Sequence, residues 1–413
     1  MNKDINDRML SIIPKSVMKI SETLNAFGHE AYIVGGAVRD SIIGIKVPVE
    51  WDMTTSAKPE EIVAIFDKVY LLGAKYGTVT VIMDQLHVEV TTYRKESGYK
   101  DKRHPEEIDF ISNIGEDLAR RDFRMNAIAF DPINSVLLDP FLGINDIENK
   151  VINTVGNPRL RFLEDGLRMM RAVRLSAVLG YEIEETTKQS IRELSANIGD
   201  ISSERIRDEV IKIIESPNPH KGMHLLEETG LLDQIFPSLL DKQYFGEACA
   251  LLKDLSRKEF DIGIAAFAIV MRASIEDLLK KLKLSKRENI RIKKLVKLVL
   301  ADYEFNDSEV ELRKLAVMAG RGEFQDVIYL KCVLKLVDQK IAELALELQN
   351  SDFAFGVSEL KVSGTDLINE CGIEPGIHVK VLLDTLLAET VEKKIENSYE
   401  ELILRAKELL KPI

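Results

Sequence analysis

The chain has 413 residues, 45% of them hydrophobic and 30% charged, which is enough for two or more domains that each bury a core. Its three cysteines are widely spaced and form no CxxC pair, which argues against a disulfide framework and a structural zinc site. We find neither a signal peptide nor an apolar run of transmembrane length, so we expect a cytoplasmic location and no membrane partner. The formal net charge of −12 argues mildly against nucleic-acid binding, unless basic residues gather on one surface.

The first predicted element is an amphipathic helix over Met1 to Gly28, because apolar residues recur there at intervals of three and four. A short apolar strand (Ala31 to Val34) follows, then Gly35-Gly36, then a second helix (Ala37 to Ile43). Two glycines between a strand and a helix let the backbone approach an anion closely, where the free N–H groups of the helix favour negative charge. The glycine pair alone would also fit an ordinary turn.

A pair of acidic residues comes next in the chain. Glu50-Trp51-Asp52 is predicted to form a second short strand, and alternate residues of a strand point the same way. We therefore expect the carboxylates of Glu50 and Asp52 to share one face. Two neighbouring carboxylates repel each other, and a divalent cation is the usual reason to keep them together.

Two β-rich runs, Gly77 to Met83 and His87 to Tyr93, predict a hairpin. Glu89 lies in the second run between two valines, where it could also be a plain solvent-facing strand residue. The polar stretch from Arg94 to Asp109 shows no periodicity and is predicted to be a loop. Loops of that length inside a compact domain are usually functional.

The rest of the chain is predicted to be mostly helical. Glu164 and Asp165 are followed by Arg168, so on one continuous helix the arginine would share a face with both carboxylates. Such a pattern is also common as a surface ion pair. Further on, the run from Lys280 to Lys297 has nine Lys or Arg against one Glu. It could follow a phosphate backbone or simply form a solvated helical face.

Taken in order, these segments resemble the class II tRNA nucleotidyltransferases and bacterial poly(A) polymerases, a family of the DNA polymerase β superfamily. The matching motifs are GGAVRD at 35–40, the acidic pair at 50–52, VEVTTYR at 88–94, RRDFRMNA at 120–127 and EDxxR at 164–168, with a weaker match across the tail. The resemblance implies an α+β fold: a polymerase-β-like head of mixed sheet and helices, then an all-α neck, body and tail. We expect a catalytic head at 1–150, a neck carrying a nucleotide-base template at 151–240, and a tRNA-binding body and tail at 241–413.

The resemblance also implies which residues form the site. Three carboxylates would carry catalysis and bind two Mg²⁺ ions: Glu50, Asp52 and Glu89. The incoming nucleotide would be bound by Gly35, Gly36, Arg39, Asp40, Arg121, Asp122, Asn126, Glu164, Asp165, Arg168 and Arg171. The acceptor arm of tRNA would be held by four basic residues of the run at 280–297: Lys286, Arg287, Arg291 and Lys294.

Two positions depart from the pattern of the resembled family. Glu50 stands where Asp is usual, and Arg124 stands where Thr is usual. One extra methylene moves the carboxylate at position 50 by more than ~1 Å, and a misplacement of that order can cost ~100-fold in rate. Arg124 could disturb the placement of phosphate, or could simply point outward.

The implied activity is template-independent addition of C, C and A to the 3′ end of tRNA from CTP and ATP, with release of pyrophosphate. Asp165 and Arg168 would read the base. Cytosine and adenine both present an amino donor beside a ring-nitrogen acceptor, which a carboxylate beside a guanidinium matches. Uracil and guanine present the reversed pattern and would leave polar groups unpaired.

Three alternatives stay open at this point. An A-adding nucleotidyltransferase and a poly(A) polymerase share the motifs of the head. A protein of another class, which binds tRNA with a head impaired by Glu50, would also fit. The sequence does not indicate an oligomeric state.

Overall fold

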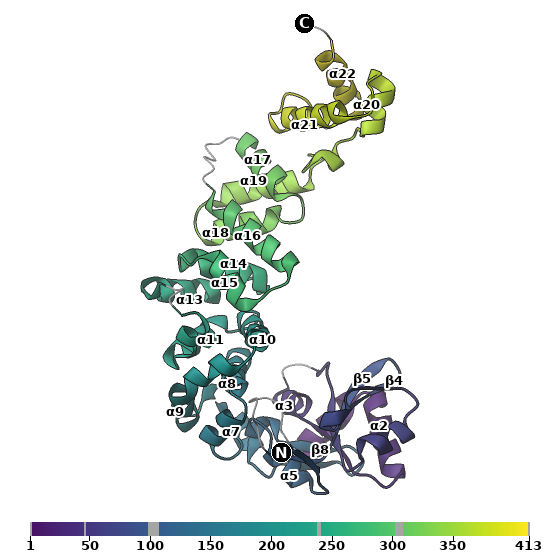
Figure 1. Cartoon of the computed structure of the whole chain (residues 1–413), viewed down its shortest axis with the longest axis vertical. Coiled ribbons are helices and arrows are strands. Elements are labelled where there is room, and N and C mark those ends of the chain that lie inside the picture. Colours follow the sequence, from purple (N-terminus) through teal and green to yellow (C-terminus); the bar gives the residue numbers. More distant parts are fainter. Residues whose placement is uncertain (1, 45–46, 98–106, 238–240, 302–308, 412–413) are drawn as a thin grey trace. The chain divides into compact units, whose positions relative to one another are not determined.

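The computed structural model describes residues 2–44, 47–97, 107–237, 241–301 and 309–411, and the chain forms two compact units, Met1–Pro237 and Ser238–Ile413 (Figure 1). The first unit combines a mixed β-sheet with helices, whereas the described part of the second unit has helices and turns but no strand. The predicted α+β class, a mixed head followed by helices, is thereby confirmed. Among the described residues, no helix is both long and apolar enough to span a bilayer.

A seven-stranded sheet forms the centre of the first unit, in the order β3-β4-β5-β2-β1-β8-β9. Strands β2 and β5 run parallel to each other, and the other neighbouring pairs are antiparallel. The strands are β1 (Ala31–Val34), β2 (Asp52–Thr55), β3 (Val69–Gly73), β4 (Thr78–Met83), β5 (Leu86–Thr92), β8 (Ala129–Asp131) and β9 (Val136–Leu138).

The predicted hairpin is confirmed, since β4 and β5 pair antiparallel across a turn at Asp84 and Gln85. Both turn residues have positive φ, 49° and 69°, as the favoured two-residue hairpin turns require. The valines of the two strands are buried, so Thr80 and Glu89, which pair with each other, face the opposite side. This alternation directs Glu89 away from the core.

Helices and two small sheets complete the first unit. The helices are α1 (Asn2–Ile12), α2 (Lys15–Ala26), α3 (Gly36–Ile43), α4 (Pro59–Ile65), α5 (Ile114–Ala119), α6 (Gly143–Glu148), α7 (Pro158–Glu164), α8 (Leu167–Leu179), α9 (Glu185–Leu194), α10 (Ser203–Ile214), α11 (Pro219–Glu228) and α12 (Leu231–Ile235), with 3₁₀ turns η1 (Ala74–Tyr76), η2 (Arg124–Asn126) and η3 (Ser195–Asp200). The small sheets pair β6 (Arg94–Ser97) with β7 (Glu107–Phe110) and β10 (Val151–Ile152) with β11 (Glu182–Ile183).

Three predicted elements have different bounds in the structure. The predicted N-terminal helix is two helices, α1 and α2, because Pro14 lacks the N–H that a continuous helix needs. The acidic strand β2 begins at Asp52, so Glu50 lies before the strand rather than within it. The predicted loop from Arg94 to Asp109 has paired strands at both described ends, and its residues 98–106 lie outside the described part of the chain.

The second unit is built from helices α13 (Phe245–Asp254), α14 (Phe260–Val270), α15 (Ile275–Leu282), α16 (Lys286–Leu300), α17 (Glu309–Ala319), α18 (Phe324–Val333), α19 (Gln339–Asn350), α20 (Gly364–Cys371), α21 (Ile377–Val391) and α22 (Tyr399–Leu409), with 3₁₀ turns η4 (Lys242–Tyr244) and η5 (Val357–Glu359). Helix α16 begins with a capping box, in which Ser285 and Glu288 satisfy each other's backbone N–H groups. The predicted basic run therefore spans the end of α15 and most of α16.

Candidate active site

The glycine motif lies where strand β1 ends and helix α3 begins, as predicted. Gly35 has φ +75°, a backbone conformation that residues with a Cβ rarely adopt. A Cβ added at Gly35 would lie 3.5 Å from both Nη1 of Arg121 and Oδ2 of Asp52. The turn therefore brings the start of α3 directly beside the acidic strand β2 and a largely buried arginine.

Arg39 lies one turn into α3, and its side chain is held by neighbouring residues. Nε and Nη2 donate to Oδ1 of Asp40 at 2.9 and 2.7 Å, and Nη1 donates to Oδ1 of Asn126 at 2.7 Å. Nη2 also lies 3.5 Å from where a Cβ at Gly36 would stand. The guanidinium is thus held beside the first turn of α3, where the backbone N–H groups attract anions.

The carboxylates of Asp52 and Glu89 are neighbours because β2 and β5 are paired in parallel with these two residues opposite each other. Glu50 lies just before β2 and lines the same cavity. The cavity has a volume of about 610 Å³ and is lined by Glu50, Trp51, Asp52, Tyr70, Thr80, His87 and Glu89. All three predicted catalytic carboxylates therefore line one cavity. Asp52 and Glu89 are brought together by the register of β2 and β5, and not by alternation along a single strand.

The electrostatics of this cavity are dominated by negative charge. Burial of the Asp52 carboxylate and the charge of Glu89 raise its pKa to about 6, and Glu50 adds to the rise. Arg121 acts in the opposite direction but does not compensate. A carboxylate with a raised pKa, beside two further carboxylates, is a site whose charge a bound cation would balance.

The donor set fits divalent cations, which prefer carboxylate oxygens. Within the described ranges, however, no three His, Cys, Asp or Glu side chains are placed closely enough to surround one metal ion. Asp52 and Glu89 are adjacent by register, whereas Glu50 enters the cavity from the segment before β2 and is exposed. The fit therefore rests on two adjacent carboxylates, with the third on a segment outside the strand.

Asp122 is a nearly buried carboxylate with several donors around it. It accepts from the backbone N–H of Phe123, from Nδ2 of Asn126 at 3.1 Å, and from Nε of Arg171 at 2.8 Å. Burial alone would raise the pKa of Asp122, but the charge of Arg171 and the hydrogen bond from Asn126 outweigh it and hold the pKa below its usual value. Asp122 is therefore ionised and fixes both Asn126 and Arg171.

Arg121 lies near both Asp52 and Asp117. Burial lowers its pKa, which the charge of Asp117 partly offsets, and Nη2 lies 3.7 Å from Oδ2 of Asp117. Its Nε is buried and has no hydrogen-bond acceptor among the described residues. A buried donor without an acceptor is costly, so the contacts that keep Arg121 in this place must offset that cost.

The acidic pair at 164–165 differs from the predicted arrangement. Helix α7 ends at Glu164 and α8 begins at Leu167, because the chain is extended at Asp165. Asp165 does not pair with Arg168; it pairs with Arg205 of α10, whose Nη2 lies 2.7 Å from Oδ2. The expectation that Asp165 and Arg168 share a helical face is therefore wrong.

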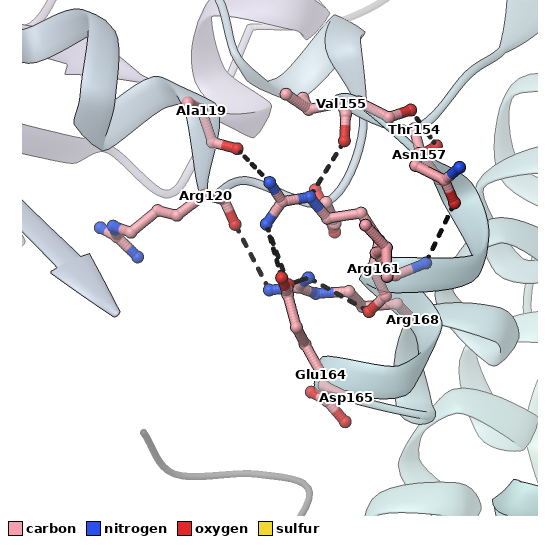
Figure 2. A network of polar contacts seen from close by, with 12 residues as sticks. Ala119, Arg120, Thr154, Val155, Asn157, Arg161, Glu164, Asp165 and Arg168 are labelled. Carbon is pink, nitrogen blue, oxygen red and sulfur yellow. Dashed lines mark hydrogen bonds and ion pairs between the residues drawn. The ribbon is translucent and has the colours of Figure 1, made fainter. Parts of the chain in front are cut away.

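Arg168 pairs instead with Glu164, at 2.5 Å, and the four-residue spacing of that pair is as expected. Arg161 also binds Glu164, at 2.9 Å, so one carboxylate holds two arginines (Figure 2). Both arginines reach back to the head: Arg161 donates to the carbonyl of Ala119 and Arg168 donates to the carbonyl of Arg120. These contacts connect α7 and α8 to the end of α5.

Arg124, the second residue that departs from the family's pattern, contacts residues of the same unit. Nε of Arg124 donates to the carbonyl of Thr154 at 3.3 Å, and Nη1 lies 4.0 Å from Oδ1 of Asp146. Neither partner is a predicted nucleotide contact. Arg124 is therefore bound to two buried residues of the first unit, and its effect on the placement of phosphate stays a prediction.

The four predicted RNA-binding residues line one cavity of about 590 Å³ on α16, together with Ile290 and Glu323. Two of them are engaged within the protein. Arg291 pairs with Asp261, Glu323 and Asp326, and Lys294 pairs with Glu323 at 3.0 Å. Lys286 and Arg287 are exposed at the start of the helix. The surface charge of this cavity is thus carried mainly by those two.

Sequence reasoning missed two residues that hold the site together. Arg205 binds Asp165 from 40 positions away, and no local pattern could have revealed that pair. Asp117 lies three and four positions before Arg120 and Arg121, a helical spacing that could have been recognised.

Three family models match the chain. A "Poly A polymerase head domain" matches residues 31–153. An "RNA and SrmB- binding site of polymerase A" matches residues 180–242, and a "tRNA nucleotidyltransferase domain 2" matches residues 259–406.

Three proteins named CCA-adding enzyme illustrate the similarity. A CCA-adding enzyme of Ligilactobacillus salivarius (strain UCC118) is 33% identical over 402 residues, which is 96% of this chain and 96% of that enzyme. A CCA-adding enzyme of Geobacillus sp. (strain WCH70) is 44% identical over 236 residues, which is 57% of this chain and 58% of that enzyme. The crystal structure of Bacillus stearothermophilus CCA-adding enzyme in complex with CTP matches with a TM-score of 0.79 at 30% identity, covering 96% of this chain and 97% of that one.

Proposed function

Because this chain belongs to the family of CCA-adding enzymes, we propose that it adds C, C and A in turn to the 3′ end of tRNA, using CTP and ATP and releasing pyrophosphate. The observation that carries the function is the 33% identity to such an enzyme across 96% of both chains. The chain is a nucleotidyltransferase, as the sequence predicted. A tRNA-binding protein without activity, an A-adding enzyme and a poly(A) polymerase are not favoured.

We propose that the triphosphate of the incoming nucleotide binds where β1 meets α3. Gly35 and Gly36 leave the N–H groups of the helix accessible to phosphate oxygens, and Arg39 and Arg121 add positive charge. Asp40 orients Arg39 through two hydrogen bonds. Nη1 of Arg121, 3.5 Å from where a Cβ at Gly35 would stand, places the charge of this arginine beside the glycine turn.

We propose that the reaction uses Mg²⁺, held by Asp52 and Glu89 with Glu50 as a third ligand. The neighbouring positions of Asp52 and Glu89 and the raised pKa of Asp52 support this assignment. When bound, such ions would activate the attacking 3′ hydroxyl group and balance the charge of the triphosphate. The protein's part is to keep these carboxylates on one cavity and to bind the nucleotide beside them.

The base is proposed to be read by Asp165 and Arg168. Each is already paired, Asp165 with Arg205 and Arg168 with Glu164, so each side chain is oriented before the nucleotide arrives. A charged partner that fixes a side chain lowers the entropy lost on binding. Asn126, Asp122 and Arg171 link this region to Arg39 through consecutive hydrogen bonds.

The tRNA is proposed to contact the basic cavity on α16, chiefly through Lys286 and Arg287. Their exposure supports this role, whereas Arg291 and Lys294 are better placed to hold α16 against its neighbours. We further propose the division into a head (1–150), a neck (151–240) and a body with tail (241–413). Since tRNA and nucleoside triphosphates are its substrates, we place the activity in the cytoplasm.

Incorporation of labelled nucleotides tests this function. The chain is incubated with Mg²⁺ and a tRNA that ends at the discriminator base, with CTP, with ATP, and with both. Two C residues with CTP alone, and one further A when both are present, are expected. Incorporation of A only onto a tRNA that already ends in CC would indicate an A-adding enzyme, and a long A tract on unrelated RNA a poly(A) polymerase. The Asp52→Asn variant controls for contaminating activity.

A further inference from the structure

The carboxylate of Asp117, in the last turn of α5, is completely buried and has no role in the proposed chemistry. Four groups surround it. Oγ1 of Thr54 donates to Oδ2 at 3.1 Å, and the backbone N–H of Arg94 donates to Oδ1 at 3.3 Å. Nε and Nη2 of Arg120 lie 2.9 and 2.8 Å from Oδ1, and Nη2 of Arg121 lies 3.7 Å from Oδ2. Both oxygens of the carboxylate are therefore used.

These groups come from three different parts of the head. Thr54 lies on β2, two residues after Asp52, so its hydrogen bond to Asp117 ties the acidic strand to α5. Arg94 is the first residue of β6, where the stretch from 94 to 109 begins. Arg121 lies near Asp52 at the Gly35 turn, and its charge acts on the Asp52 carboxylate. One buried charge thus holds the strand, the start of that stretch and the arginine together.

The backbone of the same turn is held from the other side. The carbonyl of Ala119 accepts from Nη2 of Arg161 at 2.8 Å, and the carbonyl of Arg120 accepts from Nη2 of Arg168 at 3.3 Å. Figure 2 shows this arrangement: the carbonyl of Arg120 faces Arg168, while the side chain of Arg120 extends away from it. The last turn of α5 therefore contacts the acidic strand through Asp117 and the base-reading region through its carbonyls.

We propose that Asp117 is a positioning residue that couples the base-reading helices to the strand that carries Asp52, through the last turn of α5. This inference rests on the proposed function, because it assumes that Asp165 and Arg168 read the base. Asp117 touches neither nucleotide nor metal; it acts by fixing Thr54, Arg120 and Arg121. A correctly paired base leaves Arg168 in the orientation that Glu164 gives it, whereas a mispaired base displaces Arg168 and, through the α5 turn, displaces β2 from its catalytic position.

The Asp117→Asn variant keeps the shape but removes the charge and turns one acceptor oxygen into a donor. At the Oδ1 position that donor would face the N–H groups of Arg94 and Arg120, which cannot accept it. At the Oδ2 position it would face Arg121, also a donor, and the hydroxyl of Thr54, which could accept it only while donating its own proton to the carbonyl of Thr91. Either placement breaks the hydrogen bond from Thr54 or sets donors against each other. The backbone carbonyls of the turn would still bind Arg161 and Arg168, while the hydrogen bond that ties the turn to β2 weakened. A displacement of about 1 Å at a catalytic group can cost about 100-fold in rate.

The test is single-turnover addition of the first C at saturating tRNA and CTP, compared with misincorporation from UTP. For Asp117→Asn we expect the rate with CTP to fall about 10- to 100-fold, and the ratio of the CTP rate to the UTP rate to fall at least threefold. Thr54→Val, which removes one hydrogen bond to the same carboxylate, is expected to lower the CTP rate about threefold. The double variant should be no slower than Asp117→Asn alone, because both changes break one coupling.

The control is Glu389→Gln in the second unit, which removes another nearly buried carboxylate with an arginine partner. It is expected to lower thermal stability without changing either rate. Circular dichroism at the assay temperature establishes that each variant is folded, and rates are divided by the fraction of active enzyme.

Three results would overturn the inference: an unchanged CTP rate in Asp117→Asn, an equal fall of the CTP and UTP rates, or a multiplicative fall in the double variant. If Asp117→Asn does not fold, a wild-type rate and ratio in Thr54→Val would overturn it alone. Absence of C addition by the unmodified chain would contradict the proposed function instead, so the two failures are distinguishable.

Discussion

Nη2 of Arg171 lies 2.6 Å from Oδ2 of Asp122, so an ion pair joins helix α8 to the segment that follows α5. The same carboxylate binds Asn126, whose amide oxygen accepts from Arg39. A continuous series of hydrogen bonds therefore runs from the first turns of α3 to α8. The groups proposed to bind the triphosphate and the helix proposed to read the base are parts of one polar network.

This ion pair predicts a pH dependence of stability. The pKa of Asp122 is depressed in the folded protein, so its stabilisation is present above the unfolded pKa of about 4 and is lost as pH falls below it. Asp122→Asn is expected to cost about 2 kcal/mol at pH 7, a figure reduced because solvent reaches Arg171. Urea unfolding, followed by the transition of the first unit, measures the free energy of unfolding at pH 5 and pH 3. Between these pH values Asp122→Asn should lose less of that free energy than the unmodified chain. Equal losses would contradict this account.

Asp52→Asn should remove activity and yet stabilise the protein in the absence of divalent cations. The raised pKa of Asp52 means that burial, and then the charge of Glu89, disfavour its ionised form, so a neutral amide relieves both effects. Because Asp52 lines an open cavity where solvent screens part of this repulsion, we expect a gain of about 1 kcal/mol or less, or ~1–3 °C in the melting temperature. Calorimetry in EDTA measures it. A lower melting temperature than that of the unmodified chain would be inconsistent with repulsion in this cavity.

Gly35→Ala should cost both stability and rate. Its φ of +75° is strained for alanine, by about 1–2 kcal/mol, although 3.5 Å to the nearest atoms leaves room for the methyl group. Gly28→Ala is the matched control, since Gly28 has φ +85° and open space around it. Both variants should lose similar stability in urea unfolding, but only Gly35→Ala should slow C addition, about tenfold or more. A similar rate loss in both would argue against a special role for the turn.

Glu50→Asp should raise the single-turnover rate, by up to about 100-fold, if the extra methylene holds the carboxylate more than ~1 Å from its best position. Glu50 precedes β2 and is exposed, so the change should leave the melting temperature unaffected. Glu50→Gln serves as the control that keeps the length but removes the charge, and it should be slower than either. An Asp variant no faster than the unmodified chain would mean that the segment before β2 adapts to glutamate.

The double substitution Lys286→Ala, Arg287→Ala should weaken tRNA binding without reducing stability, because both side chains are exposed. If each contacts one phosphate, the slope of log affinity against log salt should decrease in magnitude by about 1.5–2. Arg291→Met, by contrast, removes the ion pair of Asp261 with Arg291 and leaves Asp326 with Arg257 as its arginine partner, so it should destabilise the second unit by about 1–3 kcal/mol. Filter binding at several salt concentrations and urea unfolding separate the two effects. An unchanged salt slope would remove α16 from the RNA-binding surface.

Local patterns were sufficient to predict much of the fold. The hairpin at Asp84 and Gln85 and the strand-glycine-helix turn at Gly35 depend on neighbouring residues, and both are as expected. One N-terminal helix was predicted where the structure has two, because the apolar periodicity continues past Pro14, whose missing N–H interrupts the helix.

The site was harder to predict because its pairs are not local. Asp52 meets Glu89 only through the parallel register of β2 and β5, and Asp165 meets Arg205 only because α10 packs beside α8. Sequence spacing suggested Asp165 with Arg168, but the break between α7 and α8 turns the two side chains toward different partners. The register of a sheet and the packing of helices are set by the whole core, which no short motif encodes.

Trp51, buried between Glu50 and Asp52 and lining the same cavity, is the single tryptophan of the chain. Excitation at wavelengths that tryptophan absorbs and the ten tyrosines do not therefore gives fluorescence from this cavity alone. Binding of a divalent cation or a nucleotide beside Asp52 changes the field around the indole, so this chain carries its own optical probe of that event. Ligand titrations and stopped-flow measurements can follow the site in the unmodified protein, without any attached dye.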